Sequence, residues 1–241
     1  MKEGAHEFTY NGSTIEVWPG VFDPNKTSEL LIEAVIKHDL SGKSVCDMGC
    51  GSGIVGLMVA KAANPSSLSA SDISDVAIEN ARHNAALLGI KAEYKQGSLF
   101  EPWVGRKFDV ILCDISALAE PIARLSPWYP PEIHCGAGPD GAEWTTRMLA
   151  ASSGYLNRDG RVFFATASLS DENRILDVAK SSFTSVECVI KRSWPFREEF
   201  WNKIMENETA RKLIEKGIVK VLKKGSRWLW DSSIYVGSVK T

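Results

Sequence analysis

The sequence of 241 residues lacks a long apolar run, a surplus of one charge and any Cys-x-x-Cys pair. Its longest apolar stretches, such as residues 54–60, fall far short of the roughly 20 residues that cross a membrane. Lys and Arg number 28 against 30 Asp and Glu, so the whole chain has no attraction to nucleic acid or acidic membranes. The first residues, MKEG, contain no hydrophobic signal region. We therefore expect a cytoplasmic protein without a membrane partner.

Cysteine usage indicates a reducing environment. The five cysteines lie at positions 46, 50, 113, 135 and 188, and three of them fall in or beside apolar runs. An odd number without paired spacing predicts neither a disulfide framework nor a metal site. Hydrophobic residues make up 44% and charged residues 24%, which is ordinary for a globular protein.

Short apolar runs alternate with amphipathic stretches through the middle of the chain. Near-continuous apolar strands alternating with helices are typical of a parallel sheet with helices on both faces. The pattern predicts strands at 44–47, 68–72, 91–95, 108–113 and 161–166, and helices at 54–63, 75–88, 144–153 and 171–183.

Both ends depart from this alternation. Residues 6–10 and 13–18 flank Asn11-Gly12, a strong hairpin pattern. Residues 186–191 and 228–239 predict an antiparallel pair of strands, with a helical segment around 198–215 between them. We interpret residues 1–40 as a hairpin and first helix, and 41–241 as one domain with an insertion at about 194–226.

The sharpest motif is VCDMGCGSG at residues 45–53, in which a strand ends in an acid and alternate glycines open a helix. Such glycines let a ligand approach the backbone, and the helix start attracts a carboxylate or phosphate. Asp47 would repel a pyrophosphate but suits a ligand with an ammonium group, as in S-adenosylmethionine. Asp72 ends the next strand, where an acid can accept both hydroxyls of a ribose.

These motifs resemble a known family. DMGCGSGIVGL and SDISDVAIENARHNAALLG are similar to class I methyltransferases that use S-adenosylmethionine, and most of all to the release-factor glutamine methyltransferase group. The segment PGVFDP at residues 19–24 resembles the part of that group that precedes its first core helix. The resemblance covers about residues 17–191. It implies a Rossmann-like, seven-stranded, mostly parallel α/β sheet with an antiparallel C-terminal strand pair.

The resemblance also implies roles for individual residues. Asp47 would hold the amino group of the cofactor through water or backbone, Asp72 would bind the ribose, and Ile73 would lie against the adenine. Ser98 stands where the family places an acid at the adenine amine, and Leu99 would pack on the ring. The methionine part of S-adenosylmethionine would be lined by Gly49, Cys50, Gly51, Ser52 and Gly53.

The acceptor motif departs from the family. The group carries Asn-Pro-Pro-Tyr after its fourth strand, whereas this sequence has Asp114-Ile115-Ser116-Ala117. An acid at the first position is tolerated among relatives that methylate amines, but Ala117 cannot stack on an amide. We therefore expect Asp114 to be catalytic and to border both cofactor and acceptor, and we do not expect glutamine or adenine methylation.

The loop from 116 to 141 supplies further candidates. Its aromatic side chains and a histidine could enclose a small acceptor and take its proton; a proline-stiffened surface loop is the alternative. We name His134 as a second catalytic candidate. The candidate substrate-binding residues are Phe22, Asp114, Ser116, Trp128 and Tyr129.

Three functions remain open from the sequence. The first is a methyltransferase acting on a small molecule through nitrogen, oxygen or sulfur, such as an amino acid or a derivative. The second acts on a protein side chain or RNA, which the basic and aromatic insertion would favour. The third is a catalytically silent subunit that binds the cofactor. The same insertion could instead pack on the sheet or on a second copy, which leaves a homodimer open.

Overall fold

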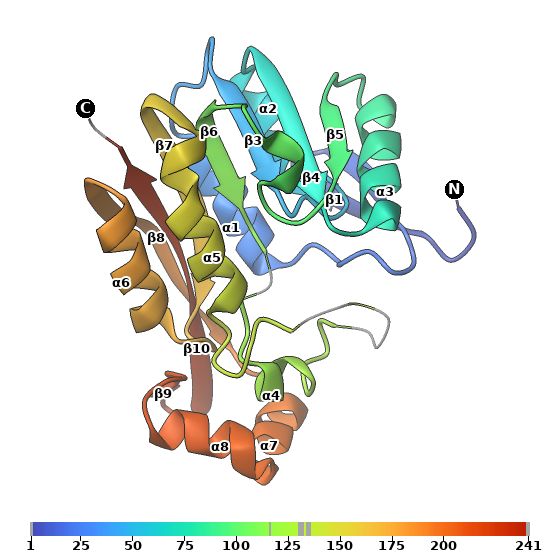
Figure 1. Cartoon of the computed structure of the whole chain (residues 1–241). Helices are drawn as coiled ribbons and strands as arrows, with labels where there is room; N and C mark the ends of the chain where they lie inside the picture. The colour runs from blue at the N-terminus through green and yellow to red at the C-terminus, as the bar shows by residue number, and fades with distance from the viewer. Residues whose placement is uncertain (1, 116, 130–132, 134–135, 240–241) are drawn as a thin grey trace.

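A computed structural model describes residues 2–115, 117–129, 133 and 136–239 (Figure 1). The strands are β1 (His6–Tyr10), β2 (Ser13–Val17), β3 (Ser44–Met48), β4 (Ser67–Asp72), β5 (Glu93–Gln96), β6 (Phe108–Cys113), β7 (Leu156–Ala167), β8 (Ser185–Pro195), β9 (Leu222–Lys224) and β10 (Arg227–Ser238). The α-helices are α1 (Lys26–Val35), α2 (Ile54–Ala63), α3 (Asp75–Leu87), α4 (Glu120–Ala123), α5 (Glu143–Ser152), α6 (Glu172–Ser182), α7 (Glu198–Glu206) and α8 (Glu208–Glu215). Two 3₁₀ turns are η1 (Glu101–Trp103) and η2 (Ser153–Tyr155).

The large sheet has the order β5-β4-β3-β6-β7-β10-β8, and the short β9 pairs with β10. The neighbours from β5 to β7 run parallel, whereas β10 is antiparallel to both β7 and β8. The predicted fold class, a mostly parallel α/β sheet with an antiparallel C-terminal pair, is therefore confirmed. The chain moves outward from β3 to β5 and then returns to β6 on the other side of β3. Ligands bind at such a switch point, at the carboxyl ends of the strands.

Helices cover both faces of the sheet. One core packs α1, α2 and α3 with the amino-terminal hairpin, through residues such as Leu31 and Leu57. The other packs α5, α6 and η1, through residues such as Trp103, Leu149 and Ile175. Figure 1 shows the two helical layers on either side of the strands. The hairpin and α1 thus share one core with the first half of the sheet.

Most predicted elements lie within a few residues of their observed ends, but the insertion differs. The helical segment expected around 198–215 is two helices, because Asn207 ends α7 and starts α8. The Asn207 side chain accepts a hydrogen bond from the backbone N–H of Ala210 at 2.9 Å. An asparagine in this role caps a helix start. In Figure 1 the insertion forms the lower end of the molecule.

The amino-terminal hairpin turns at Asn11 and Gly12, which have φ of 45° and 75°, as the prediction required. Asn80 and Asn84 of α3 hold it in place. Asn84 accepts from the backbone N–H of Glu16 at 2.9 Å and donates to the carbonyl of Glu16 at 2.8 Å. Asn84 also donates to the carbonyl of Ser52 at 2.9 Å, so one buried amide joins the hairpin to the glycine loop.

Candidate active site

The loop after β3 bends at Gly49, Gly51 and Gly53, which have φ of 71°, 52° and 84°. Residues other than glycine rarely adopt this backbone conformation. A Cβ on Gly49 would lie 2.4 Å from Cγ2 of Ile115, whereas a Cβ on Gly51 would meet no heavy atom within 4 Å. The loop is therefore closely packed at Gly49 and open at Gly51, beside the start of α2.

The other two residues of the loop are buried. Cys50 is 5% and Ser52 is 2% exposed, and burial raises the pKa of the Cys50 thiol well above its ordinary value. The hydroxyl of Ser52 has no hydrogen-bond partner among the described residues. Ligand contacts predicted for this pair would therefore use backbone groups.

Asp72 ties the glycine loop to the end of β4. Its Oδ2 accepts from the backbone N–H of Gly51 and its Oδ1 from that of Ser74, both at 2.9 Å. Burial raises the pKa of this carboxyl above its ordinary value. A carboxylate oxygen can accept more than one hydrogen bond, so both oxygens can also accept from ribose hydroxyls.

Asp47 lies behind the loop rather than in the open space. Its side chain is 1% exposed, and Oδ2 accepts from the backbone N–H of Gly56 in α2 at 2.8 Å. Burial raises its pKa to about 7, the bond from Gly56 opposes this rise, and the charges of Asp114 and Asp72 add to it. Asp47 therefore holds strand, loop and helix together, and its predicted contact with a ligand would pass through the backbone.

Asp47, Asp72 and Asp114 lie at the ends of three adjacent strands, β3, β4 and β6. Three carboxylates in one partly buried site repel a pyrophosphate and favour a positively charged ligand. The sulfonium and ammonium groups of S-adenosylmethionine have this charge. The open space at Gly51 and the free acceptor positions of Asp72 also suit its methionine and ribose parts, so these residues fit S-adenosylmethionine.

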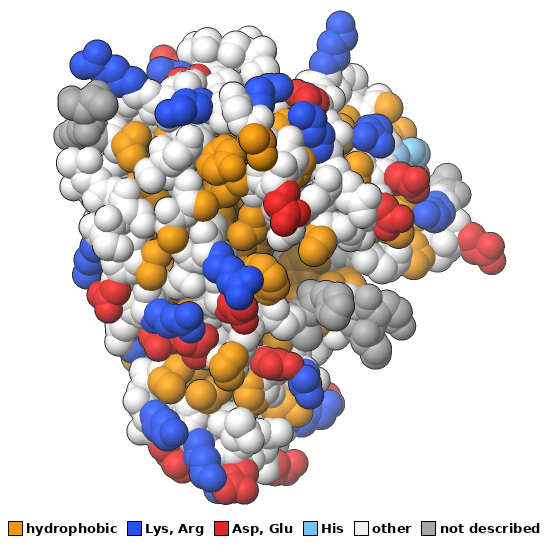
Figure 2. Space-filling model, viewed as in Figure 1, with side chains coloured by type: hydrophobic (Ala, Val, Ile, Leu, Met, Phe, Trp, Pro, Cys, Tyr) orange, Lys and Arg blue, Asp and Glu red, His pale blue; other side chains and the backbone are white. Residues whose placement is uncertain are grey.

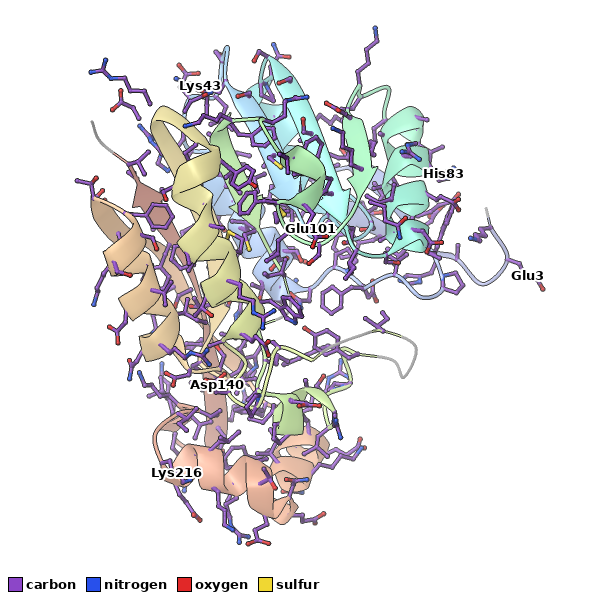
Figure 3. The ribbon with its side chains drawn as sticks, in the orientation of Figure 1. Glu3, Lys43, His83, Glu101, Asp140 and Lys216 are labelled. Carbon is purple, nitrogen blue, oxygen red and sulfur yellow. The ribbon has the colours of Figure 1, made fainter. Side chains whose placement is uncertain are left out.

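An apolar rim extends beyond Asp72. Ile73 is 67% exposed, and Leu99 holds a positive φ of 48° without being a glycine. A non-glycine residue with this strained backbone conformation indicates a functional site. Ser98 donates its backbone N–H to Oε2 of Glu101 at 3.2 Å. Figure 3 labels Glu101 near the middle of the molecule, beside the ends of the central strands.

Glu101 was missed by the sequence reasoning. The family pattern placed Ser98 where an acid would meet the adenine amine, and the structure brings the Glu101 carboxylate to the backbone of that residue. The contact spans the turn that leads into η1, and a Ser-x-x-Glu pattern at residues 98–101 was the available sign.

Asp114 lies directly after β6, opposite the start of α1. The hydroxyl of Ser28 donates to its Oδ2 at 2.5 Å. Burial raises the pKa of Asp114 to about 7, and the bond from Ser28 opposes this rise. At neutral pH this carboxyl can therefore either hold or release a proton.

Ser28 is the second residue that sequence reasoning missed. It belongs to the capping box of α1, in which Asn25 accepts from the backbone N–H groups of Thr27 and Ser28. The Ser28 hydroxyl accepts from the backbone N–H of Asn25 at 3.4 Å while it donates to Asp114. The spacing of Asn25 and Ser28 predicts a helix start, but not the carboxylate that it meets across the fold.

A small acceptor pocket, of about 40 Å³, opens beside Asp114. Phe22, Trp128 and Tyr129 line it, and the rings of Phe22 and Tyr129 have centroids 5.0 Å apart. Sequence reasoning did not find Thr166 or Trp230, which form another wall. Figure 2 shows a hollow with hydrophobic side chains near the middle of this face. The structure thus brings together Asp114 and three of the four other predicted substrate-binding residues.

Two predicted residues, Ser116 and His134, lie outside the described residues, and their roles remain predictions. The cytoplasmic location and the homodimer also remain predictions. Among the described ranges, no helix has the length and apolarity that crossing a membrane requires.

Comparison with known proteins gives the family. The family described as Methyltransferase small domain matches residues 13–115. The release factor glutamine methyltransferase of Clostridium acetobutylicum is 30% identical over 189 residues, covering 74% of this chain and 66% of that protein. The enzyme of the same name from Geobacter sulfurreducens is 28% identical over 65% of this chain and 56% of its own length. The chain thus spans between about half and two thirds of the length of these two relatives.

Solved structures support the fold. The ribosomal protein L11 methylase of Lactobacillus delbrueckii has a TM-score of 0.56 at 21% identity, covering 92% of this chain and 84% of that one. A T. thermophilus 16S rRNA methyltransferase in complex with AdoMet and guanosine has a TM-score of 0.62 at 16% identity, covering 98% of this chain and 50% of that one.

The chain is a class I S-adenosylmethionine-dependent methyltransferase, and it is similar to the release-factor glutamine methyltransferases. S-adenosylmethionine is the cofactor of this class, as the sequence predicted. The acceptor is not given by the family.

Proposed function

We propose that this protein methylates an amine nitrogen on a side chain of another protein. The observation that carries the proposal is the Asp114 carboxyl at a pocket of about 40 Å³. Such a pocket has room for the tip of a side chain rather than for a whole metabolite. A carboxylate at its base matches an ammonium group, which a neutral amide does not offer.

The cofactor would be held by residues at the ends of β3 and β4. The backbone around Gly51 would contact its methionine part, Asp72 its ribose, and Ile73 and Leu99 its adenine. Bound S-adenosylmethionine supplies the methyl group from its sulfonium. The contribution of this chain is alignment, which is worth up to about 7–11 kcal/mol in favourable reactions.

Asp114 would act on the acceptor. In its ionised form it binds an ammonium group and accepts the proton that the nitrogen must lose before it has a free electron pair. Ser28 fixes one carboxylate oxygen and leaves the other for the acceptor. Phe22 and Tyr129 would place aromatic faces beside the cation, an arrangement worth about 0.5–2 kcal/mol.

The named relatives support a protein acceptor. They include release factor glutamine methyltransferases and, at 38% identity over 49% of this chain, a ribosomal protein L11 methyltransferase of Caldicellulosiruptor saccharolyticus. The missing Asn-Pro-Pro-Tyr motif disfavours glutamine, because Ile115 packs against Gly49 and Ala117 has no ring.

A small-molecule amine is the second candidate. This was the leading expectation from the sequence, and the loss of the amide-binding motif still favours it. It would need a pocket larger than the one beside Asp114.

Transfer of labelled methyl groups from S-adenosylmethionine to separate protein, RNA and metabolite fractions tests the proposal. We expect label in protein, recovered after hydrolysis as a methylated amine. Asp114→Asn should slow the labelling by about a hundredfold, and Asp159→Asn, at a side chain that is 69% exposed, should not change it. Label in metabolites would support the second candidate, and label in RNA or in methylated glutamine would refute the amine assignment.

A further inference from the structure

An aromatic groove of about 390 Å³ lies beside the acceptor pocket, between the start of α1 and the start of α7. We use this name for the surface lined chiefly by Trp128, Trp194, Phe196, Arg197, Phe200 and Trp230. It includes the first residues of the basic insertion, whose role the methyl-transfer chemistry does not explain. Figure 2 shows hydrophobic side chains also gathering over the lower part of the molecule, where Figure 1 has α7 and α8.

The aromatic groove and the acceptor pocket are neighbours that share a wall. Asn25, Trp128 and Trp230 line both of them. A side chain that reaches Asp114 would therefore leave its neighbouring residues in or beside the groove. The groove is also much larger than the pocket, so it can accept what the pocket excludes.

The rings in the groove suit apolar side chains better than nucleobases. Trp128 meets Phe200 edge-on at 5.4 Å and lies tilted to Trp230 at 5.1 Å. Bases stack on exposed flat faces, whereas these rings use their faces and edges on one another.

One cation at the groove makes no ion pair within the described residues. Lys26 pairs with Glu29 at 2.8 Å, so these two largely cancel. Arg197 is exposed, and its charge helps to lower the pKa of the nearby Glu199 carboxyl without a direct ion pair. Its planar guanidinium favours a carboxylate. The indole nitrogen of Trp194 is buried and has no hydrogen-bond partner among the described residues.

We propose that the aromatic groove binds the segment of an acceptor protein that flanks the methylated nitrogen. The segment lies extended, with a large apolar or aromatic residue among the rings and an acidic residue at Arg197. The acceptor preference would then come from the neighbours of the modified residue and not only from Asp114. This inference rests on the proposed function, because it requires a protein acceptor.

Direct binding of short lysine peptides tests this inference without requiring methyl transfer. One set carries Phe and Asp at varied distances from the lysine, and a matched set carries Ala at both positions. Binding is measured by calorimetry in the presence of S-adenosylhomocysteine. We expect at least one Phe-Asp peptide to bind about tenfold more tightly than its Ala match.

Variants locate the binding site. Arg197→Ala should remove about tenfold of affinity for the Asp-containing peptide and leave the Ala peptide unchanged. Phe196→Ala should remove about tenfold of affinity for the Phe-containing peptide and leave the Ala peptide unchanged. Thermal unfolding of this variant checks that the half-buried ring is not needed for folding. Arg158→Ala, at a side chain that is 78% exposed on β7, is the matched control and should change nothing.

The outcomes separate the two proposals. Equal binding of the two peptide sets, or Arg197→Ala without effect, would overturn the groove assignment. So would an oligouridylate that binds wild-type protein and loses binding in Phe196→Ala. The expected peptide preferences without methyl transfer to any protein would keep the groove and remove the proposed function. Methyl transfer to both peptide sets with equal kcat/KM would support the proposed function and overturn the groove assignment.

Discussion

Replacing Asp47 by Asn should change how the stability of the protein depends on pH. Asp47 is 1% exposed, and its Oδ2 accepts from the backbone of Gly56. Asn is close to Asp in shape and its carbonyl oxygen can accept the same hydrogen bond. The substitution therefore removes the ionisation of a buried group while its packing is retained.

The size of the effect follows from the pKa of Asp47, which rises from an ordinary 3.8 to about 7 in the folded protein. Between these values the folded chain holds a proton that the unfolded chain has released. Stability is therefore lost as pH rises, by about 1.4 kcal/mol per pH unit, until the pH passes about 7. Between about pH 5.5 and about pH 8, Asp47 accounts for a loss of about 2 kcal/mol.

Urea unfolding without cofactor, at these two pH values, measures the effect. From the lower to the higher pH, the free energy of unfolding of wild type should decrease by about 2 kcal/mol more than that of Asp47→Asn. Asp72 and Asp114 also have raised pKa values and remain in both proteins, so only the difference between the proteins is diagnostic. Asp159→Asn, at an exposed residue with φ of 58°, is the matched control. Equal pH dependence in wild type and Asp47→Asn would refute the reasoning.

Three further results are expected. Asp72→Ala should weaken S-adenosylmethionine binding by about tenfold or more, because hydrogen bonds to a charged group contribute about 1.5–3 kcal/mol; an unchanged Kd in calorimetry would contradict the ribose assignment. Asp114→Asn should lower kcat by about a hundredfold with little change in cofactor Kd, and wild-type kcat should rise as the pH passes about 7 while the variant stays flat. Ser28→Ala removes a bond that favours ionised Asp114, so the midpoint of that rise should move to higher pH; a midpoint that stays in place would show that Ser28 does not set the proton affinity.

The sequence predicted the parts of the site that come from one continuous segment. Strand, glycines, helix and acid follow one another between Val45 and Asp72, so spacing alone places them at one edge of a parallel sheet. The position of the Asp47 side chain could not be read in this way. That position depends on how closely Gly56, in the first turn of α2, approaches Asp47 near the end of β3.

The acceptor side was less predictable because distant segments form it. Ser28 and Asp114 are 86 residues apart, and Trp230 comes from the last strand. No local pattern reports such pairings. The aromatic residues of the insertion had a packing interpretation and a binding interpretation, and composition could not separate them. Trp128 and Phe200 show that the rings pack together and line a groove at the same time.

The Asn84 side chain links the amino-terminal hairpin to the glycine loop of the cofactor site. One amide holds the backbone of Glu16 on one side and that of Ser52 on the other. S-adenosylmethionine bound at the loop should stabilise the hairpin. A change that loosens the hairpin should then raise the dissociation constant of S-adenosylmethionine, and the two effects are equal in size. Amide exchange at Glu16 would thus report occupancy of a site that this residue does not line.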